Sequence, residues 1–283
     1  MKQHNIERII DSVDKLPTLP VIYTKLTNIL EQSNATINKI ANIISEDQTI
    51  AAKVLKIVNS VFYGFPKKIA SLQRAVVILG LKEIKNLVLA TSTLKMFEQL
   101  QPGDELDMKS FWEHSIGCAT SAKVLAEAAY LRNPEDVFTG GLLHDIGKLV
   151  HALYLPQEFS SVVADIRDTG MPMFESEKRI IGFTHDQTGR ILAEKWGFPE
   201  EVTNMITEHH LNHESSNLTK EVAAVHIGNI LCIAFSLGSG GEKRVPIANQ
   251  KAWEILGLRL GTLESITGRI IKLFREAISI LEL

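Results

Sequence analysis

The sequence has few cysteines and no excess of basic residues, and each of these absences excludes a class of protein. Its 283 residues include only two cysteines, Cys118 and Cys232, which lie far apart, so we exclude a disulfide framework and expect a reducing compartment. The 30 basic residues do not outnumber the 33 acidic ones, whereas duplex-binding proteins usually carry a clear basic excess. We therefore expect no nucleic-acid partner.

Long hydrophobic runs are also missing. The longest run, from Ala223 to Gly238, is interrupted by His226 and Asn229, and it is shorter than the roughly 20 residues that a membrane-spanning helix needs. Residues 1–11 are polar and charged and lack the apolar segment of an export signal. These observations predict a cytoplasmic protein without a membrane partner.

Helical periodicity runs along nearly the whole chain. Apolar residues recur at steps of three and four, as at Ile37, Ile40 and Ile44, which is typical of a helix with one buried face. No series of short alternating segments predicts a sheet, and most prolines stand where helices would begin or end. The sequence therefore predicts an all-α protein of roughly a dozen helices of ordinary length.

Two loop-forming stretches suggest how the chain is divided. Residues 101–104, Gln-Pro-Gly-Asp, separate an amino-terminal helical lobe, residues 1–100, from a second helical lobe, residues 101–237. A carboxy-terminal loop and helix, residues 238–283, follow. We expect these parts to form a single module that spans the chain.

The loop at 238–241 reads Gly-Ser-Gly-Gly and invites a phosphate-binding interpretation. It matches no nucleotide-binding motif and follows no predicted strand. We interpret it as a flexible connector before a last helix that we expect from about Thr262 to Leu281.

Eight of the nine histidines fall within residues 114–226. Imidazole nitrogens together with a carboxylate suit Zn, Fe or Mn rather than Ca or Mg. Neighbouring residues of a helix point about 100° apart. An adjacent His-Asp pair can therefore bind one metal only near a helix end, or if the metal lies between the directions of the two side chains. Any one of these histidines alone is more often a hydrogen-bonded core residue. The candidate metal ligands are His114, His144, Asp145, His185, His209 and His210.

Several separated motifs give these residues a context. Gly-Leu-Leu-His-Asp-Ile-Gly-Lys at 141–148 resembles the signature of the HD superfamily of metal-dependent phosphohydrolases. Other motifs resemble, in the right order, the HDOD family, the HD-related output domains of bacterial signalling. They are Leu-Pro-Thr-Leu-Pro at 16–20, Ile-Ser-Glu-Asp at 44–47, the stretch from Leu55 to Gly64, and Ala-Val-Val-Ile-Leu-Gly at 75–80. The resemblance covers about residues 13–211 and implies a compact, multi-helix HD-like fold.

The resemblance also implies roles for the candidate residues. In the related HD-GYP phosphodiesterases the ligands include a first His, a His-Asp pair, a later His and two adjacent His, which the six candidates match in chain order. Asp145 would be the carboxylate able to bridge two metals, and Lys148 matches a lysine that contacts substrate phosphate. The sequence departs from that pattern at Ser110 and Asn229, where those enzymes have carboxylates. The Gly-Tyr-Pro signature is absent, and residues 211–214 read Leu-Asn-His-Glu.

The missing carboxylates limit how many metal ions the site can hold. Two divalent ions bring four positive charges, and Asp145 alone cannot offset them, since burying unbalanced ions costs several kcal/mol each. We therefore expect one divalent transition metal, Fe, Mn or Zn. Two metals, and a metal-free site in which Lys148 pairs with Asp145 at the i+3 spacing, are the alternatives.

Three further features have a structural and a functional interpretation. The stretch from Asn59 to Lys68 joins aromatic to basic residues, and we interpret it as a packed corner rather than a surface for nucleic-acid bases. We take His226 as a core histidine that could substitute for a ligand, and Cys118 as a buried thiol rather than a ligand.

We interpret the protein as a bacterial signal-transduction output or regulatory module, with a degenerate His/Asp metal site and no turnover. Its partner would be a signalling protein or a small ligand. The alternative is a metal-dependent phosphohydrolase or phosphodiesterase that acts on a nucleotide or cyclic dinucleotide. In that case Asp145 and Lys148 would be the catalytic residues, one anchoring the metal and the other stabilising phosphoryl charge.

Overall fold

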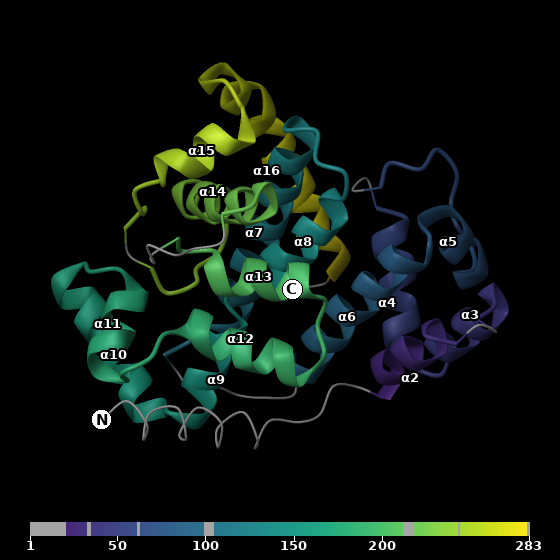
Figure 1. Ribbon diagram of the computed structural model, residues 1–283, viewed down its shortest axis with the longest axis horizontal. Helices are drawn as coiled ribbons and strands as arrows, with labels where there is room; N and C mark the ends of the chain where they lie inside the picture. Colours follow the sequence, from purple (N-terminus) through teal and green to yellow (C-terminus); the bar gives the residue numbers. More distant parts are fainter. Residues whose placement is uncertain are drawn as a thin grey trace. The chain divides into compact units, whose positions relative to one another are not determined.

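The regular secondary structure of the described residues is entirely helical (Figure 1). The computed structural model describes residues 21–32, 35–60, 63–98, 105–211, 218–242 and 244–281, and no strand occurs in these ranges. The all-α prediction is therefore confirmed. The motif at 16–20, the stretch at 101–104 and most of 211–214 lie outside the described residues, as does the amino-terminal segment.

Helix length and composition bear on membrane insertion. Within the described ranges, none of the helices is both long enough and apolar enough to cross a bilayer.

The described chain forms two compact units. One contains residues 21–98 and 272–281, and the other contains residues 105–271. Every candidate metal ligand lies in the unit of residues 105–271.

The unit of residues 21–98 is built from amphipathic helices joined by short connections. These helices are α2 (Val21–Leu30), α3 (Ile37–Ser45), α4 (Gln48–Val58), α5 (Leu72–Leu79) and α6 (Leu81–Glu98). The apolar repeat found in the sequence forms the buried face of α3, where Ile40 and Ile44 are 1% and 0% exposed. The motif at 44–47 marks a helix boundary, because the Asp47 carboxylate accepts hydrogen bonds from the Thr49 and Ile50 backbone N–H groups at the start of α4.

Asn59 connects α4 to the loop that follows it. Its side-chain amide donates to Leu55 O and Ile69 O, each at 2.8 Å, and its oxygen accepts from Ile69 N–H at 2.7 Å. The next residue, Ser60, donates its hydroxyl to Ile57 O at 2.6 Å. Residues 61–62 lie outside the described part. The interpretation of this stretch as a packed corner is confirmed at Asn59 and Ser60.

Replacing Asn59 by alanine is expected to destabilise this unit by about 1–3 kcal/mol, because the backbone groups of the buried Ile69 would lose their side-chain partners. The measurement is the denaturant unfolding midpoint of the full chain. Asn38→Ala on α3, at an exposed position, is the matched control and should leave the midpoint nearly unchanged. Equal midpoints for the two variants would contradict a role for Asn59 at this corner.

The unit of residues 105–271 surrounds one buried helix. Its helices are α7 (Met108–Ala128), α8 (Pro134–Leu143), α9 (Ile146–Tyr154), α10 (Pro156–Thr169), α11 (Met173–Ile180), α12 (His185–Lys195), α13 (Glu200–Glu208), α14 (Lys220–Ala234), α15 (Gln250–Leu256) and the first part of α16 (Leu260–Leu281). Almost every residue of α7 from Phe111 to Ala126 is buried, which is typical of a central core helix.

Small residues bring α8 and α14 close to α7 (Figure 1). A Cβ atom at Gly141 would lie 2.8 Å from Ala119 Cα, and one at Gly228 would lie 2.7 Å from Ala122 N. The three backbones are therefore nearly in contact at these points. This close packing carries His114 of α7 and Asn229 of α14 into the interior, where they are 0% and 4% exposed.

Candidate metal centre

The His-Asp pair lies at the junction of two helices. α8 ends at Leu143 and α9 begins at Ile146, so His144 and Asp145 are the residues between them. His144 Nδ1 donates to Gly141 O at 2.7 Å, which leaves its Nε2 atom facing Asp145 Oδ2 at 3.3 Å. Of the two arrangements expected for such a pair, the structure shows the one at a helix end.

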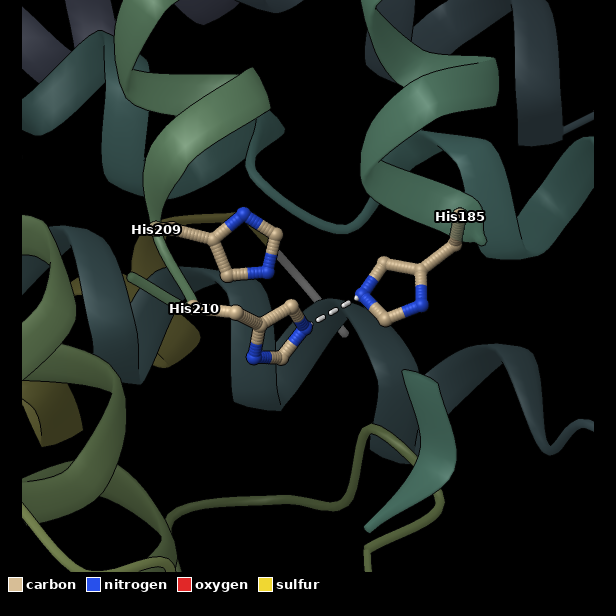
Figure 2. Close-up of side chains that lie close together, drawn as sticks. All are labelled: His185, His209 and His210. Atoms are coloured by element: carbon tan, nitrogen blue, oxygen red, sulfur yellow. Dashed lines mark hydrogen bonds between the residues drawn. The ribbon is translucent and has the colours of Figure 1, made fainter. Parts of the chain in front are cut away.

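Helix ends also supply three of the other histidines. His185 is the first residue of α12, and the Gln187 side chain accepts a hydrogen bond from the Thr184 backbone N–H at the start of this helix. His209 follows the last residue of α13 and donates from Nδ1 to Ile206 O at 2.8 Å. Figure 2 shows the rings of His185, His209 and His210 gathered together, with the His210 and His185 Nε2 atoms 2.8 Å apart.

Asp145 lies at the middle of the cluster. Its Oδ2 atom is 3.5 Å from His114 Nε2 and 3.3 Å from His144 Nε2. Its Oδ1 atom is 3.3 Å from His185 Nε2 and 3.6 Å from His209 Nε2. The structure thus brings all six candidates together in two groups that could hold a metal, His114–His144–Asp145 and His185–His209–His210.

The chemistry of these atoms suits a cation. The Nε2 atoms of His114, His144 and His209 are buried and find no hydrogen-bond partner among the described residues. In His144 and His209 the other ring nitrogen donates to a backbone carbonyl, so Nε2 carries the free lone pair. Leaving a buried polar atom unpaired costs about 1–3 kcal/mol, and a metal ion would use these lone pairs. The residues therefore fit a metal.

Lys148 is a buried lysine within the cluster. Its Nζ atom is 2.8 Å from Asp145 Oδ2, 2.8 Å from Glu242 Oε1 and 3.0 Å from Gly240 O. Burial alone would lower the pKa of Lys148, but the two carboxylates raise it above its ordinary value. Burial likewise favours a high pKa for Asp145, yet His144 and Lys148 hold it well below the usual range. Both groups are therefore charged, and the i, i+3 ion pair is present.

The loop at 238–241, interpreted above as a connector, packs against the centre. Ser239 N–H donates to Ser110 O at 2.9 Å, and Gly238 has φ +72°. A Cβ atom at residue 240 would lie 2.8 Å from Asp145 Oδ2 and 3.0 Å from His114 Nε2, and one at Gly238 would lie 2.2 Å from the His114 backbone nitrogen, so a larger side chain at either position would displace groups of the centre. The loop connects α14 to the segment that follows, as expected, and its packing against Ser110, His114 and Asp145 is a finding that the sequence did not reveal.

Two carboxylates that the sequence did not single out belong to this region. Glu242, directly after the loop, pairs with Lys148 across 94 positions of sequence. Glu177, on α11, accepts from the backbone N–H of His185 at 2.9 Å and from its Nδ1 at 2.6 Å. The other Glu177 oxygen contacts His151 Nδ1 at 3.1 Å. Neither residue lies in a recognisable sequence motif. The pair of glycines directly before Glu242 is the one sequence feature that could have drawn attention to it.

Glu177 sets the charge and orientation of His185. Burial disfavours the charged imidazolium, but the adjacent Glu177 carboxylate raises the pKa of His185 to about 10. Burial lowers the pKa of His209 and His210 well below the ordinary value, with neighbouring imidazoles adding to the effect. Without a metal, His185 is therefore a cation beside two neutral imidazoles, and it donates from Nε2 toward His210.

Replacing Glu177 by glutamine is expected to weaken metal binding about 10- to 100-fold, because carboxylates that orient a ligating histidine have effects of this size. Competition with a chelator measures the affinity, and circular dichroism checks folding. Glu175→Gln is the matched control, since Glu175 is exposed on the same helix. Equal metal affinities for the two variants would show that Glu177 does not act on the centre.

The remaining candidates are accounted for. His226 donates from Nδ1 to His209 O at 2.8 Å and accepts from Asn249 N–H at 3.0 Å, so both nitrogens are used and the core interpretation is confirmed. Burial raises the pKa of both thiols well above the ordinary value. Cys118 lies 3.9 Å from Val225 O, whereas Cys232 lies 3.4 Å from His114 Nδ1, a contact that the sequence did not reveal.

Known proteins resemble this chain in sequence and in fold. The family model described as HDOD domain matches residues 16–212. A solved structure of an HDOD domain protein of unknown function from Geobacter sulfurreducens has 26% identity and a TM-score of 0.80, and the match covers 99% of each chain. An uncharacterized protein of Treponema pallidum is 26% identical over 84% of this chain, which spans 46% of that protein's length.

Two further solved structures share the fold. A protein of Shewanella amazonensis, provisionally named a phosphohydrolase, has 22% identity and a TM-score of 0.71 over 95% of this chain and 98% of its own. A protein of Marinobacter aquaeolei, provisionally named a signal transduction protein, has 23% identity and a TM-score of 0.70 over 98% of this chain and 64% of its own. At these identities the likeness concerns the fold alone.

Proposed function

The chain belongs to the HDOD family, and from that premise we propose that it is a regulatory module of bacterial signal transduction, located in the cytoplasm. Its His/Asp centre holds one divalent metal ion and turns over no substrate. The observation that carries this proposal is the full engagement of Lys148. Its output is the binding of a partner protein or a small ligand.

Lys148 has no free donor for a substrate. An ammonium group offers three N–H donors, and Lys148 has three acceptors, on Asp145, Glu242 and Gly240, within 3.0 Å. Its side chain is 0% exposed. A phosphate group would have to displace a carboxylate from this lysine, so the arrangement favours a site without turnover.

The charges near the centre favour a single metal ion. The carboxylates of Asp145, Glu177 and Glu242 bring three negative charges, and Lys148 brings one positive charge. With neutral histidines the balance is two negative charges, which one divalent ion offsets and which two ions would exceed. Nitrogen and oxygen ligands of this kind suit Fe, Mn or Zn.

The candidate ligands would contribute to metal binding in different ways. His144 and His209 are held by their Nδ1 hydrogen bonds, and Glu177 orients His185. Asp145 supplies the charge. When bound, the metal would act as a Lewis acid toward a water or a phosphoryl oxygen.

A phosphohydrolase acting on a nucleotide or cyclic dinucleotide is the second candidate. All six candidate ligands and Lys148 come together as that chemistry would require. In that case Asp145 anchors the metal and Lys148, released from Glu242, stabilises phosphoryl charge.

Metal analysis combined with turnover assays separates the two functions. The full chain is supplemented with Fe, Mn or Zn, dialysed, analysed for metal and incubated with nucleotides and cyclic dinucleotides. We expect a single metal equivalent and product formation no faster than in the Asp145→Asn variant. Turnover by the native chain that both Asp145→Asn and Lys148→Met abolish would replace the regulatory proposal with the enzymatic one.

A further inference from the structure

A cavity of about 540 Å³ adjoins the metal centre, a size typical of sites for small organic molecules. Its walls come from residues 170–174 before and at the start of α11, from residues 209–211 after α13, from α14, from Glu242 and from the segment 244–249. More than half of the lining residues are apolar, including Met171, Leu211, Ile230 and Pro246. The ring of Phe174 lies 4.8 Å from that of His210 and adds an aromatic surface.

Two buried acceptors line this apolar space. Asn229 is 4% exposed, and its Oδ1 atom has no hydrogen-bond partner among the described residues. The Glu242 side chain is 8% exposed. Glu242 Oε1 binds Lys148, while Oε2 likewise has no partner in the described part of the chain. Leaving a buried acceptor without a donor is unfavourable, so a ligand that brings N–H donors to these atoms is favoured.

Two of the histidines in the cavity wall are already engaged. Both ring nitrogens of His226 are hydrogen-bonded, and the free Nε2 of His209 faces Asp145. Arg244 is exposed, with its guanidinium packed against the Gly170 backbone. The buried wall therefore offers acceptors and one carboxylate, whereas the Lys148 ammonium behind it is engaged.

We propose that this cavity binds a small organic molecule with an apolar body and a cationic head, an amidine or a protonated amine, that donates to Glu242 Oε2. The Asn229 oxygen is a second acceptor for the same class of ligand. A phosphate or carboxylate head would face the Glu242 carboxylate, and of the two cations nearby Lys148 is engaged and Arg244 is exposed. The proposal rests on the regulatory function above and names its ligand class.

Glu242 would also couple the binding of such a ligand to the metal centre. The same carboxylate contacts the ligand head through Oε2 and Lys148 through Oε1, and Lys148 contacts Asp145. Binding that changes the Glu242–Lys148 contact changes the charge environment of Asp145. By linkage, metal and ligand then alter one another's affinity by equal factors.

Calorimetric titration of the full chain with benzamidine tests the proposal, with benzoate and phenyl phosphate as anionic probes on the same ring. We expect benzamidine to bind and both anions to bind at least about tenfold more weakly, as loss of a charge-assisted hydrogen bond implies. Glu242→Gln should weaken benzamidine binding by about tenfold or more. Glu201→Gln, at an exposed position, is the control and should have no effect.

A second variant is needed because substituting Glu242 also removes a partner of Lys148. Ile230→Trp fills the apolar part of the cavity and should abolish benzamidine binding while metal content is retained. The proposal is wrong if no probe binds, if the anions bind as well as benzamidine, or if neither Glu242→Gln nor Ile230→Trp weakens the titration. Turnover of phosphate esters would overturn the regulatory function separately, since the probe titration reports only on the cavity.

Discussion

Replacing Asp145 by asparagine is expected to strip the protein of its metal. Both carboxylate oxygens of Asp145 face imidazole nitrogens, with Oδ2 3.3 Å from His144 and Oδ1 3.3 Å from His185. Asparagine removes the negative charge and turns one of the two acceptors into a donor. We expect an affinity loss of about 100-fold or more, larger than the effect of changing a residue that only orients a ligand.

Elemental analysis after dialysis measures this loss, and chelator competition gives its size. The matched control is Asp168→Asn, because Asp168 is exposed on α10 and should leave metal content unchanged. Circular dichroism shows whether the Asp145 variant remains folded. A folded Asp145→Asn protein that keeps a full metal equivalent would show that the centre does not bind its ion through this carboxylate.

Replacing Gly147 by alanine is expected to have the largest effect on stability. A Cβ atom at this position would lie 2.0 Å from His185 O and 2.9 Å from Gly189 N. Both are backbone atoms, so the clash is relieved only if α9 moves away from α12. Overpacking a core usually costs about 1–3 kcal/mol, and a rigid backbone neighbour places this change at or above the upper end.

The denaturant unfolding midpoint of the full chain measures this effect. Gly268→Ala on α16 is the matched control, because residue 268 is exposed and has no atom within 4 Å of an added Cβ. The control should gain up to about 1 kcal/mol from helix propensity. The Gly147 variant should also bind metal more weakly, since α9 follows Asp145 and α12 begins with His185. A native-like midpoint for Gly147→Ala would contradict the close approach of the two helices.

Much of the fold follows from local features of the sequence. The repeat at Ile40 and Ile44 predicts the buried face of α3, and the expected last helix from about Thr262 differs by two residues from α16, which begins at Leu260. A helix end at the His-Asp pair was one of two arrangements that the sequence allowed, because the directions of side chains on a helix follow from its geometry. Each of these properties depends on neighbours a few positions apart.

The assembly of the six candidate ligands could be expected only through the family resemblance. His114 comes from the middle of α7, whereas His185 and His209 come from the ends of α12 and α13. Spacing along the chain says nothing about which helices meet. The pattern of motifs supplied that information. The structure brings four of the five histidines to within 3.6 Å of the Asp145 oxygens and places the fifth, His210, against His185.

The sequence by itself established an all-helical protein with a histidine-rich centre and a lysine one turn after its aspartate. It also suggested a centre poor in carboxylates, and the structure changes that view. Glu177 and Glu242 reach His185 and Lys148 from distant parts of the chain, and the loop at 238–241 lies against His114 and Asp145. Charge balance and hydrogen bonding depend on neighbours in space rather than in sequence. For that reason the engagement of Lys148, on which the proposed function rests, became visible only in the folded chain.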